Sequence, residues 1–167
     1  MNKTLDNYLC EAYPRIFIER SLSPRDSCMG RGFECGNGWF PIIHLLCYNI
    51  QQHIDGHNKY AKQRKEARIP QFVATQVKEK FGALRIYNDG GDEYCQGLVD
   101  MAATWSWNTC ELCGNGGKRL VGHTTGWIGS VCEECSKKIK RPIKFDMEIK
   151  KMLIKAVKQD LKQYVQG

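Results

Sequence analysis

Within the first 108 residues, hydrophobic residues recur at helical spacing in three places, at residues 5–12, 41–54 and 92–105. The first pattern stops just before Pro14, and the second begins with Pro41, which suits a first helical turn because its missing N–H is not needed there. Asn37 or Gly38 is the expected cap of the second helix. These patterns predict three helices, and the second should lie at the centre of the core.

The third predicted helix starts at Asp92, and its apolar face is expected to consist of Tyr94, Leu98, Met101, Ala102 and Trp105. The strongly basic stretch at residues 59–68 follows the second helix and is expected to be a solvated linker or an extension of that helix.

Alternating apolar and polar residues at positions 71–88 predict a β-hairpin with Phe81-Gly82 at its turn. Residues 16–18 suggest a short extended piece, whereas residues 21–38 are rich in turn formers and predict a loop. Two further short strands are expected at residues 118–122 and 127–131, joined by residues 123–126.

A last amphipathic helix, rich in lysine, is expected from about Phe145 to Tyr164. Together these elements predict an α+β fold in which helices pack on a β-hairpin. We expect three parts: a core at residues 1–108, a cysteine-rich ribbon at 109–136 and a basic amphipathic helix at 137–167. The 167 residues, 42% of them hydrophobic, suffice for one core with a small appended module.

No membrane segment is expected, because the longest uncharged apolar stretch, Trp39–Ile50, is shorter than the roughly 20 residues that cross a bilayer. The N-terminus also lacks the features of a secretory signal, so we expect a cytoplasmic protein. In a reducing compartment, nine cysteines at partly short spacing indicate metal ligands and small core residues rather than a disulfide framework.

Four cysteines form a C-x2-C, x18, C-x2-C pattern: Cys110, Cys113, Cys132 and Cys135. Two thiolates separated by two residues fit one side of a tetrahedral zinc ion, and Gly114 eases the sharp turn that follows the first pair. We therefore predict a zinc ribbon with one structural Zn²⁺, since four thiolates leave no position for a reactive water. Reduced cysteines or two disulfides are the alternatives.

A second metal site is conceivable from four other residues: Cys28, Cys35, His53 and His57. The two histidines are one helical turn apart, but the cysteines are spaced more widely than in a usual knuckle. A plain solvated helix end is the preferred interpretation.

The net charge is +7, and residues 1–135 contain as many acidic as basic side chains. The whole excess therefore lies in residues 136–167. A localised basic segment favours an anionic partner more strongly than the same charge spread over the chain.

Catalytic residues are not evident. Cys47 and Cys95 occupy helix positions typical of packing cysteines, and His44 is explained as a core histidine. Glu79 and the acids at 89–93 fit a charged hairpin tip and a helix N-terminus. The glycine-rich stretch at 30–39 has two interpretations: an anion-binding loop with Arg31, Gly36 and Gly38, or a tight loop with Trp39 anchored in the core, which we favour.

Three motifs occur together and in order: Cys35-Gly-Asn-Gly-Trp39, the run Gln76-Val-Lys-Glu-Lys-Phe-Gly-Ala-Leu-Arg85, and the two C-x2-C pairs with Gly126-Trp127 between them. This combination, over roughly residues 30–135, resembles a group of small uncharacterised proteins encoded by bacteriophages and prophages. The resemblance carries no activity. It implies a phage or prophage context, with an accessory protein that acts on nucleic acid or blocks a host factor such as a defence system.

The leading hypothesis is a non-catalytic nucleic-acid-binding protein that contacts DNA or RNA phosphates. The candidate residues are Lys118, Arg119, His123, Lys137, Lys138, Lys140, Arg141, Lys144, Lys151 and Lys155. The alternative is an inhibitor that binds a host protein complex, or a second copy of the chain, through the apolar stripe Ile149, Leu153, Val157 and Leu161. An enzyme with an unrecognised site is a third hypothesis, and it would require a cleft with a perturbed titratable group.

Overall fold

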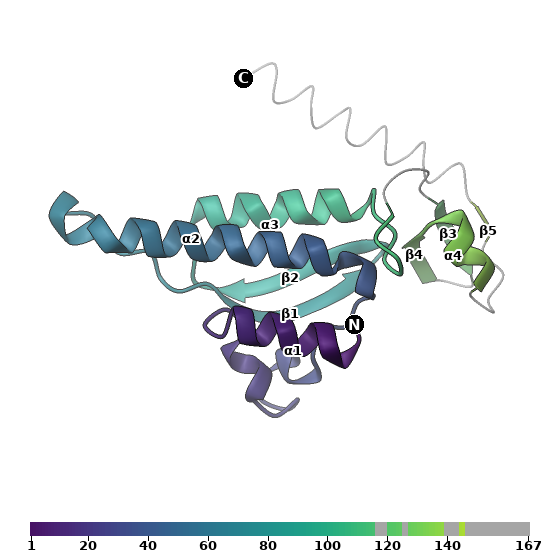
Figure 1. The fold of residues 1–167 in the computed structure, drawn as a ribbon, viewed down its shortest axis with the longest axis horizontal. Helices are drawn as coiled ribbons and strands as arrows, with labels where there is room; N and C mark the ends of the chain where they lie inside the picture. The colour runs from purple at the N-terminus through teal and green to yellow at the C-terminus, as the bar shows by residue number, and fades with distance from the viewer. Residues whose placement is uncertain (116–119, 125–126, 139–143, 146–167) are drawn as a thin grey trace, which may run out of the picture.

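The computed structural model describes residues 1–115, 120–124, 127–138 and 144–145. Within these residues the α-helices are α1 (Lys3–Ala12), α2 (Phe40–Arg64), α3 (Glu93–Ser106) and α4 (Glu133–Lys138). Short 3-10 helices span Ile18–Ser21, Cys28–Arg31 and Asn37–Trp39. The strands are β1 (Val73–Lys80), β2 (Ala83–Asp89), β3 (Leu120–Thr124), β4 (Trp127–Val131) and β5 (Lys144–Phe145). The predicted α+β class is confirmed (Figure 1).

Strands β1 and β2 form the predicted antiparallel hairpin, with Lys80 opposite Ala83 and Phe81-Gly82 as a two-residue turn. The open edge of β1 is partly covered by the glycine-rich loop. There the Glu34 N–H donates to the Val77 carbonyl and the Glu79 N–H donates to the Glu34 carbonyl, each at 2.9 Å. The hairpin therefore gains one residue of a third, parallel strand.

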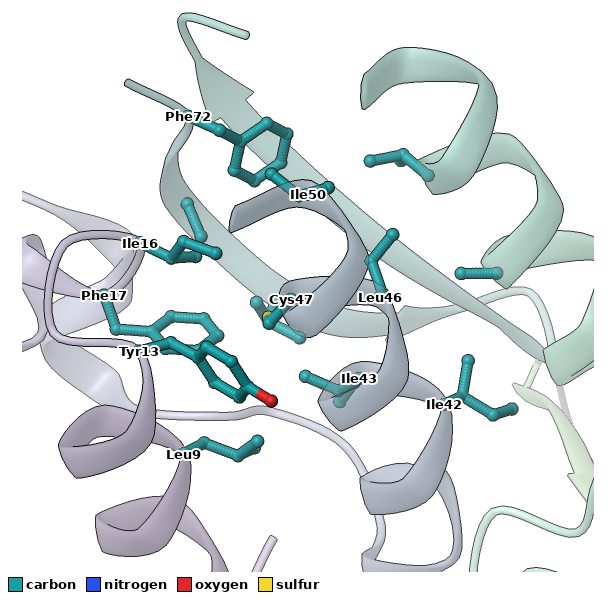
Figure 2. Packing of buried hydrophobic residues seen from close by; sticks show 14 of the residues in the cluster. Leu9, Tyr13, Ile16, Phe17, Ile42, Ile43, Leu46, Cys47, Ile50 and Phe72 are labelled. Carbon is teal, nitrogen blue, oxygen red and sulfur yellow. The ribbon is translucent and has the colours of Figure 1, made fainter. Parts of the chain in front are cut away.

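Helices α2 and α3 run antiparallel, side by side, along the hairpin (Figure 1). Helix α1 and the turn after it contact α2 on the side away from α3 (Figure 2). The labelled side chains meet in one cluster around α2: Leu9, Tyr13, Ile16, Phe17, Ile42, Ile43, Leu46, Cys47, Ile50 and Phe72. The prediction that α2 is central is confirmed, since Ile43 and Ile50 are fully buried.

Helix α2 begins differently from the prediction. Its N-cap is Trp39, without a side-chain capping bond, because Asn37 and Gly38 belong to a 3-10 turn that precedes it. The helix continues through Gly56 to Arg64 and ends at Lys65, which adopts a left-handed conformation with φ of 57°. Most of the basic stretch at 59–68 is therefore a helix extension.

The predicted apolar face of α3 is confirmed at Leu98, which packs against the core, and at Ala102, but it is wrong at its three largest side chains. The residues that face the core are Cys95, Val99, Ala102 and Ser106, whereas Tyr94, Met101 and Trp105 are about half exposed. Small side chains let α3 approach α2 and the hairpin closely, and Ser106 adds a hydrogen bond by accepting the Leu84 N–H at 2.8 Å. Helix α3 thus buries small side chains and leaves its large aromatic ones partly exposed.

Three smaller expectations also need correction. Residues 16–18 form no strand: they belong to a turn and the start of a 3-10 helix, and two further 3-10 turns interrupt the loop predicted at 21–38. The last helix is predicted to begin near Phe145, but Phe145 lies in β5, opposite Gly122 of β3. The rest of that predicted helix lies outside the described residues. Within the described residues, no helix is long and apolar enough to cross a membrane.

Candidate metal centre and its attachment to the core

Cys110, Cys113, Cys132 and Cys135 come together, and their sulfur atoms all lie within 4.8 Å of one another. Four thiolates at about 2.3 Å from a tetrahedral zinc ion would lie about 3.8 Å apart. The Sγ atoms of Cys113 and Cys132 are 3.7 Å apart, which matches that separation. The four cysteines therefore form a cluster that fits a metal ion.

The first cysteine pair lies in a tight turn. Gly114 has a φ of 76°, and its N–H donates to the Cys110 carbonyl at 2.8 Å. Burial alone would raise the pKa of the Cys110 thiol, but the backbone N–H groups of Cys132, Cys113 and Leu112 donate to its sulfur and lower the pKa to about 7. Such N–H···S bonds also orient a thiolate toward a metal.

The second pair joins a strand to a helix. Cys132 directly follows β4, and Cys135 lies in α4, whose Ser136 N–H donates to the Cys132 carbonyl at 2.9 Å. Burial, together with the neighbouring thiols, raises the pKa of Cys135 to about 12. Because metal binding requires thiolates, an ion at this cluster would displace protons on binding.

We call residues 109–138 with β5 the cysteine module. Strands β3 and β4 pair antiparallel over their full lengths, and β5 adds to the other edge of β3. The two strands predicted between the cysteine pairs are thus confirmed, with the first shifted by two residues.

Glu111 connects the cysteine module to the core. This residue lies between two of the cysteines and is buried, and its side chain accepts the Gly36 N–H at 2.8 Å. Its backbone carbonyl accepts the Gly38 N–H at 2.7 Å, and its own N–H donates to Ser130 of β4 at 2.8 Å. Burial raises the pKa of the Glu111 carboxyl to about 7. No pattern in the sequence indicated that Glu111, a charged residue between two cysteines, connects the module to the core.

On the core side, the glycine-rich loop at residues 30–39 packs against the cysteine module. A Cβ atom on Gly38 would overlap the Cys110 carbonyl and the Gly114 nitrogen, and one on Gly36 would overlap Glu111. Trp39 follows, fully buried, with its indole N–H donating to the Thr109 carbonyl at 3.0 Å. The favoured interpretation, a tight loop with Trp39 in the core, agrees with these contacts.

The alternative of an anion loop finds no support in this geometry. The N–H groups of Gly36 and Gly38 already donate to Glu111, and Arg31 is exposed at the end of a separate 3-10 turn. An anion would have to displace the contacts that hold the cysteine module.

The hairpin turn is a second attachment point. The Ser130 hydroxyl, buried in β4, donates to the Gly82 carbonyl. Figure 1 shows β1 running toward the β3–β4 sheet, so the turn lies beside the cysteine module.

The candidate nucleic-acid-binding residues are only partly described. Lys137 and Lys138 are exposed on α4, where the Lys137 Nζ atom lies 3.7 Å from the Glu133 Oε1 atom. His123 and Lys144 are opposite each other in the β3–β5 pairing. The other predicted residues lie outside the described part of the chain: Lys118, Arg119, Lys140, Arg141, Lys151 and Lys155.

The second metal site considered in the sequence does not form from its four residues. Cys35 is buried and Cys28 is exposed on a separate turn, while the His57 Nε2 atom donates to the Ala67 carbonyl at 2.9 Å. His53 instead donates to Asp92 at 2.8 Å, and the ligand atoms of His53, Asp92 and Cys95 lie within 4.8 Å of one another.

This second cluster is explained by its hydrogen bonds. One Asp92 oxygen caps α3 by accepting the Cys95 N–H at 3.0 Å, and the other accepts the His53 ring N–H. Burial is the main cause that raises the pKa of the Cys95 thiol to about 11, so the thiol stays protonated near neutral pH. The cluster joins α2 to the start of α3.

The other residues weighed as catalytic have structural contacts. Cys47 is buried, and burial raises the pKa of its thiol strongly, as expected of a packing cysteine. The His44 Nδ1 atom is hydrogen-bonded to the Tyr13 hydroxyl at 2.9 Å, and its ring stacks on Phe40. Glu79 accepts the Gly82 N–H at 2.6 Å within the hairpin turn.

Comparison of the chain with protein-family models, with curated proteins and with solved structures finds no match.

Proposed function

We propose that this chain is a zinc-binding protein that binds DNA or RNA without acting on it chemically. Zinc is the proposed ion because four thiolates in tetrahedral spacing are a typical structural zinc site. A single Zn²⁺ would then hold the cysteine module in shape, with no open position for a water or substrate.

The observation that carries the nucleic-acid proposal is the charge attached to this module. Residues 137–144 contain five basic side chains and no acidic one. The segment leaves the module through α4, which carries Cys135, and re-enters the sheet through β5, which pairs with β3. Five cations are therefore tethered at both ends to one small scaffold, and phosphate contacts of this kind give strong, sequence-independent affinity.

We also propose a phage or prophage accessory role in the cytoplasm of a host cell. All nine cysteines are free thiols, and a thiolate metal site requires a reducing environment. The three motifs that resemble phage and prophage proteins support the same context.

The test compares two triple variants of the full chain that lose equal charge. K137S/K138S/K140S removes cations of the tethered segment, whereas K3S/R25S/K62S removes exposed cations from the core. Fluorescence anisotropy with labelled DNA and RNA should show that the first variant loses about two to three units of log–log salt slope and most of the affinity. Equal loss in both variants would contradict the proposal.

A second candidate function, inhibition through protein contacts, is favoured by a different observation. Large apolar side chains of α2 and α3 are exposed: Leu45, Tyr48, Tyr94, Met101 and Trp105. An exposed apolar surface of this kind often marks a protein-binding site. If the wild-type chain binds no nucleic acid and Met101→Ser/Trp105→Ser abolishes its interaction with a protein partner, the inhibitor hypothesis replaces the first.

A further inference from the structure

The turn of the β1–β2 hairpin has an unusual residue at its tip. Phe81 has a φ of 55° and Gly82 a φ of 76°, so both central residues of the two-residue turn are left-handed. Asparagine, aspartate and glycine are preferred in such turns, and a bulky residue is strained there. Phe81 is also 69% exposed, so core packing does not compensate for this strain.

A pair of like charges on the strands next to the turn also destabilises the hairpin. Lys78 of β1 lies directly opposite Arg85 of β2, and like charges at paired positions destabilise a hairpin. No salt bridge involves Lys78, Lys80 or Arg85 within the described part of the chain. Three cations are thus gathered on one short surface and form no ion pair with any described carboxylate. The Glu34 side chain, next to Lys78, accepts a hydrogen bond from Gln76 instead, at 2.9 Å.

Two aromatic rings lie next to these cations. Tyr87 is 43% exposed, and the Lys78 ammonium lies 5.5 Å from its ring centroid, while the Lys80 ammonium lies 5.8 Å from the Phe81 ring. The paired positions Gln76–Tyr87 and Lys78–Arg85 point to the same side of the hairpin, because alternate residues of a strand share a face. We call Lys78, Lys80, Phe81, Arg85 and Tyr87 the hairpin strip.

We infer that the hairpin strip binds single-stranded nucleic acid, with Phe81 and Tyr87 stacking on bases and the three cations contacting phosphates. This inference rests on the proposed function and names its interface. A single strand suits the surface better than a duplex, because exposed rings stack on bases only where these are unpaired. An acidic peptide would match the cations but would leave both rings without a stacking partner.

The location of the strip supports this assignment. The Gly82 carbonyl accepts a hydrogen bond from Ser130 of the cysteine module, so the strip ends beside the module that carries the tethered cations. Its length along the hairpin, from the level of Tyr87 to Phe81, is about 17 Å at about 3.4 Å for each residue of a strand. One strand of nucleic acid can therefore follow the hairpin and continue onto the cysteine module.

Two substitutions separate binding from folding. Phe81→Asn removes the ring and places a favoured residue in the turn, so the folded protein should be at least as stable as the wild type. Arg85→Glu replaces a like-charge pair with an opposite-charge pair, which should also maintain or raise stability. Tyr60→Asn and Arg25→Glu are the matched controls, since both residues are exposed on other parts of the molecule.

Affinity is measured by anisotropy for an oligothymidylate of about 12 nucleotides, within the range of single-strand site sizes, and for a duplex of equal length. Phe81→Asn should weaken single-strand binding about tenfold, the usual effect of losing one base stack, with a smaller change for the duplex. Arg85→Glu should weaken both, and the controls should bind like the wild type.

Wild-type affinity in both strip variants would overturn the inference. If K137S/K138S/K140S loses affinity in that case, the proposed function stands and the interface lies on the cysteine module alone. If the wild-type chain binds neither oligonucleotide, the proposed function itself fails.

Discussion

Cys113 and Cys132 show most directly what individual residues contribute to this structure. Their sulfurs have the separation of two ligands on one tetrahedral ion, although the residues are far apart in sequence. The spacing of the cysteines predicts this cluster, because each pair fits one side of a zinc ion. It could not predict Glu111, whose role depends on contacts with glycines about 75 residues earlier in the chain.

Cys113→Ser should abolish metal binding, because three thiolates and a hydroxyl hold zinc much more weakly than four thiolates. We expect one zinc ion in each wild-type chain and almost none in the variant, measured by elemental analysis of purified protein. Cys28→Ser is the control, since Cys28 is an exposed cysteine outside the cluster and its loss should leave the zinc content unchanged. Full zinc occupancy in Cys113→Ser would contradict the assignment of this residue as a ligand.

The Asp92 carboxyl makes a pH-dependent contribution to the stability of the fold. Burial opposes its ionisation, but hydrogen bonds from His53 and the Cys95 N–H outweigh that effect and lower the pKa of Asp92 to about 2. A carboxyl with a lowered pKa in the folded state stabilises the protein above its unfolded pKa, 3.8. That contribution is lost as the pH falls from about 4 toward 2.

Asp92→Asn keeps an N-cap acceptor but removes the charge, so its cost should be about 1 kcal/mol at neutral pH, after screening by solvent. That cost should shrink as the pH falls below about 4 and be nearly gone at about pH 2. Asp92→Ala also loses the cap and should cost about 1–2 kcal/mol even in acid. Urea denaturation across this pH range measures both differences. A cost of Asp92→Asn that does not change with pH would show that the charge on Asp92 does not contribute.

At the scale of elements, the hairpin and the three core helices are predictable because their signals are local. Alternation identifies β1 and β2, and Pro41 correctly places the first turn of α2. The buried face of α3 is not predictable in this way. Cys95, Ala102 and Ser106 are buried because α2 and the hairpin approach closely, and that proximity is a property of the tertiary structure.

The role of the glycine-rich loop is likewise not predictable from local signals. Its composition predicts a turn-rich segment, but the reason for glycine at position 38 appears only when the first cysteine turn packs against it. The loop is therefore one half of the interface between the core and the cysteine module.

Gly38→Ala should destabilise the protein by about 2 kcal/mol, because the new methyl group meets backbone atoms that have no space to move. Gly97→Ala in α3 is the matched control. A Cβ at Gly97 contacts nothing within 4 Å, and alanine should stabilise the helix by about 0.5–1 kcal/mol. Denaturant unfolding followed by circular dichroism measures both, and equal stability of the two variants would contradict the packing described for the loop.

At the scale of the whole molecule, the cysteine module and the hairpin turn meet at one end of the core, joined by Ser130 and Gly82. Helix α4, which carries Lys137 and Lys138, and the turn of the hairpin strip are both at this end. The exposed apolar residues Leu45, Tyr48, Tyr94, Met101 and Trp105 belong to α2 and α3 instead. The charge excess after Cys135 was predictable from composition, whereas the strip was not, because strand pairing is what brings Lys78 and Arg85 together.

The wild-type protein's affinity for single-stranded DNA, measured at salt concentrations from about 50 to 200 mM, tests nucleic-acid binding most directly. With about four phosphates neutralised, the affinity should fall about fiftyfold over this range. Binding that does not change with salt, or no binding at the lowest salt concentration, would contradict a nucleic-acid-binding function, and the apolar surface of α2 and α3 would then be the site to test.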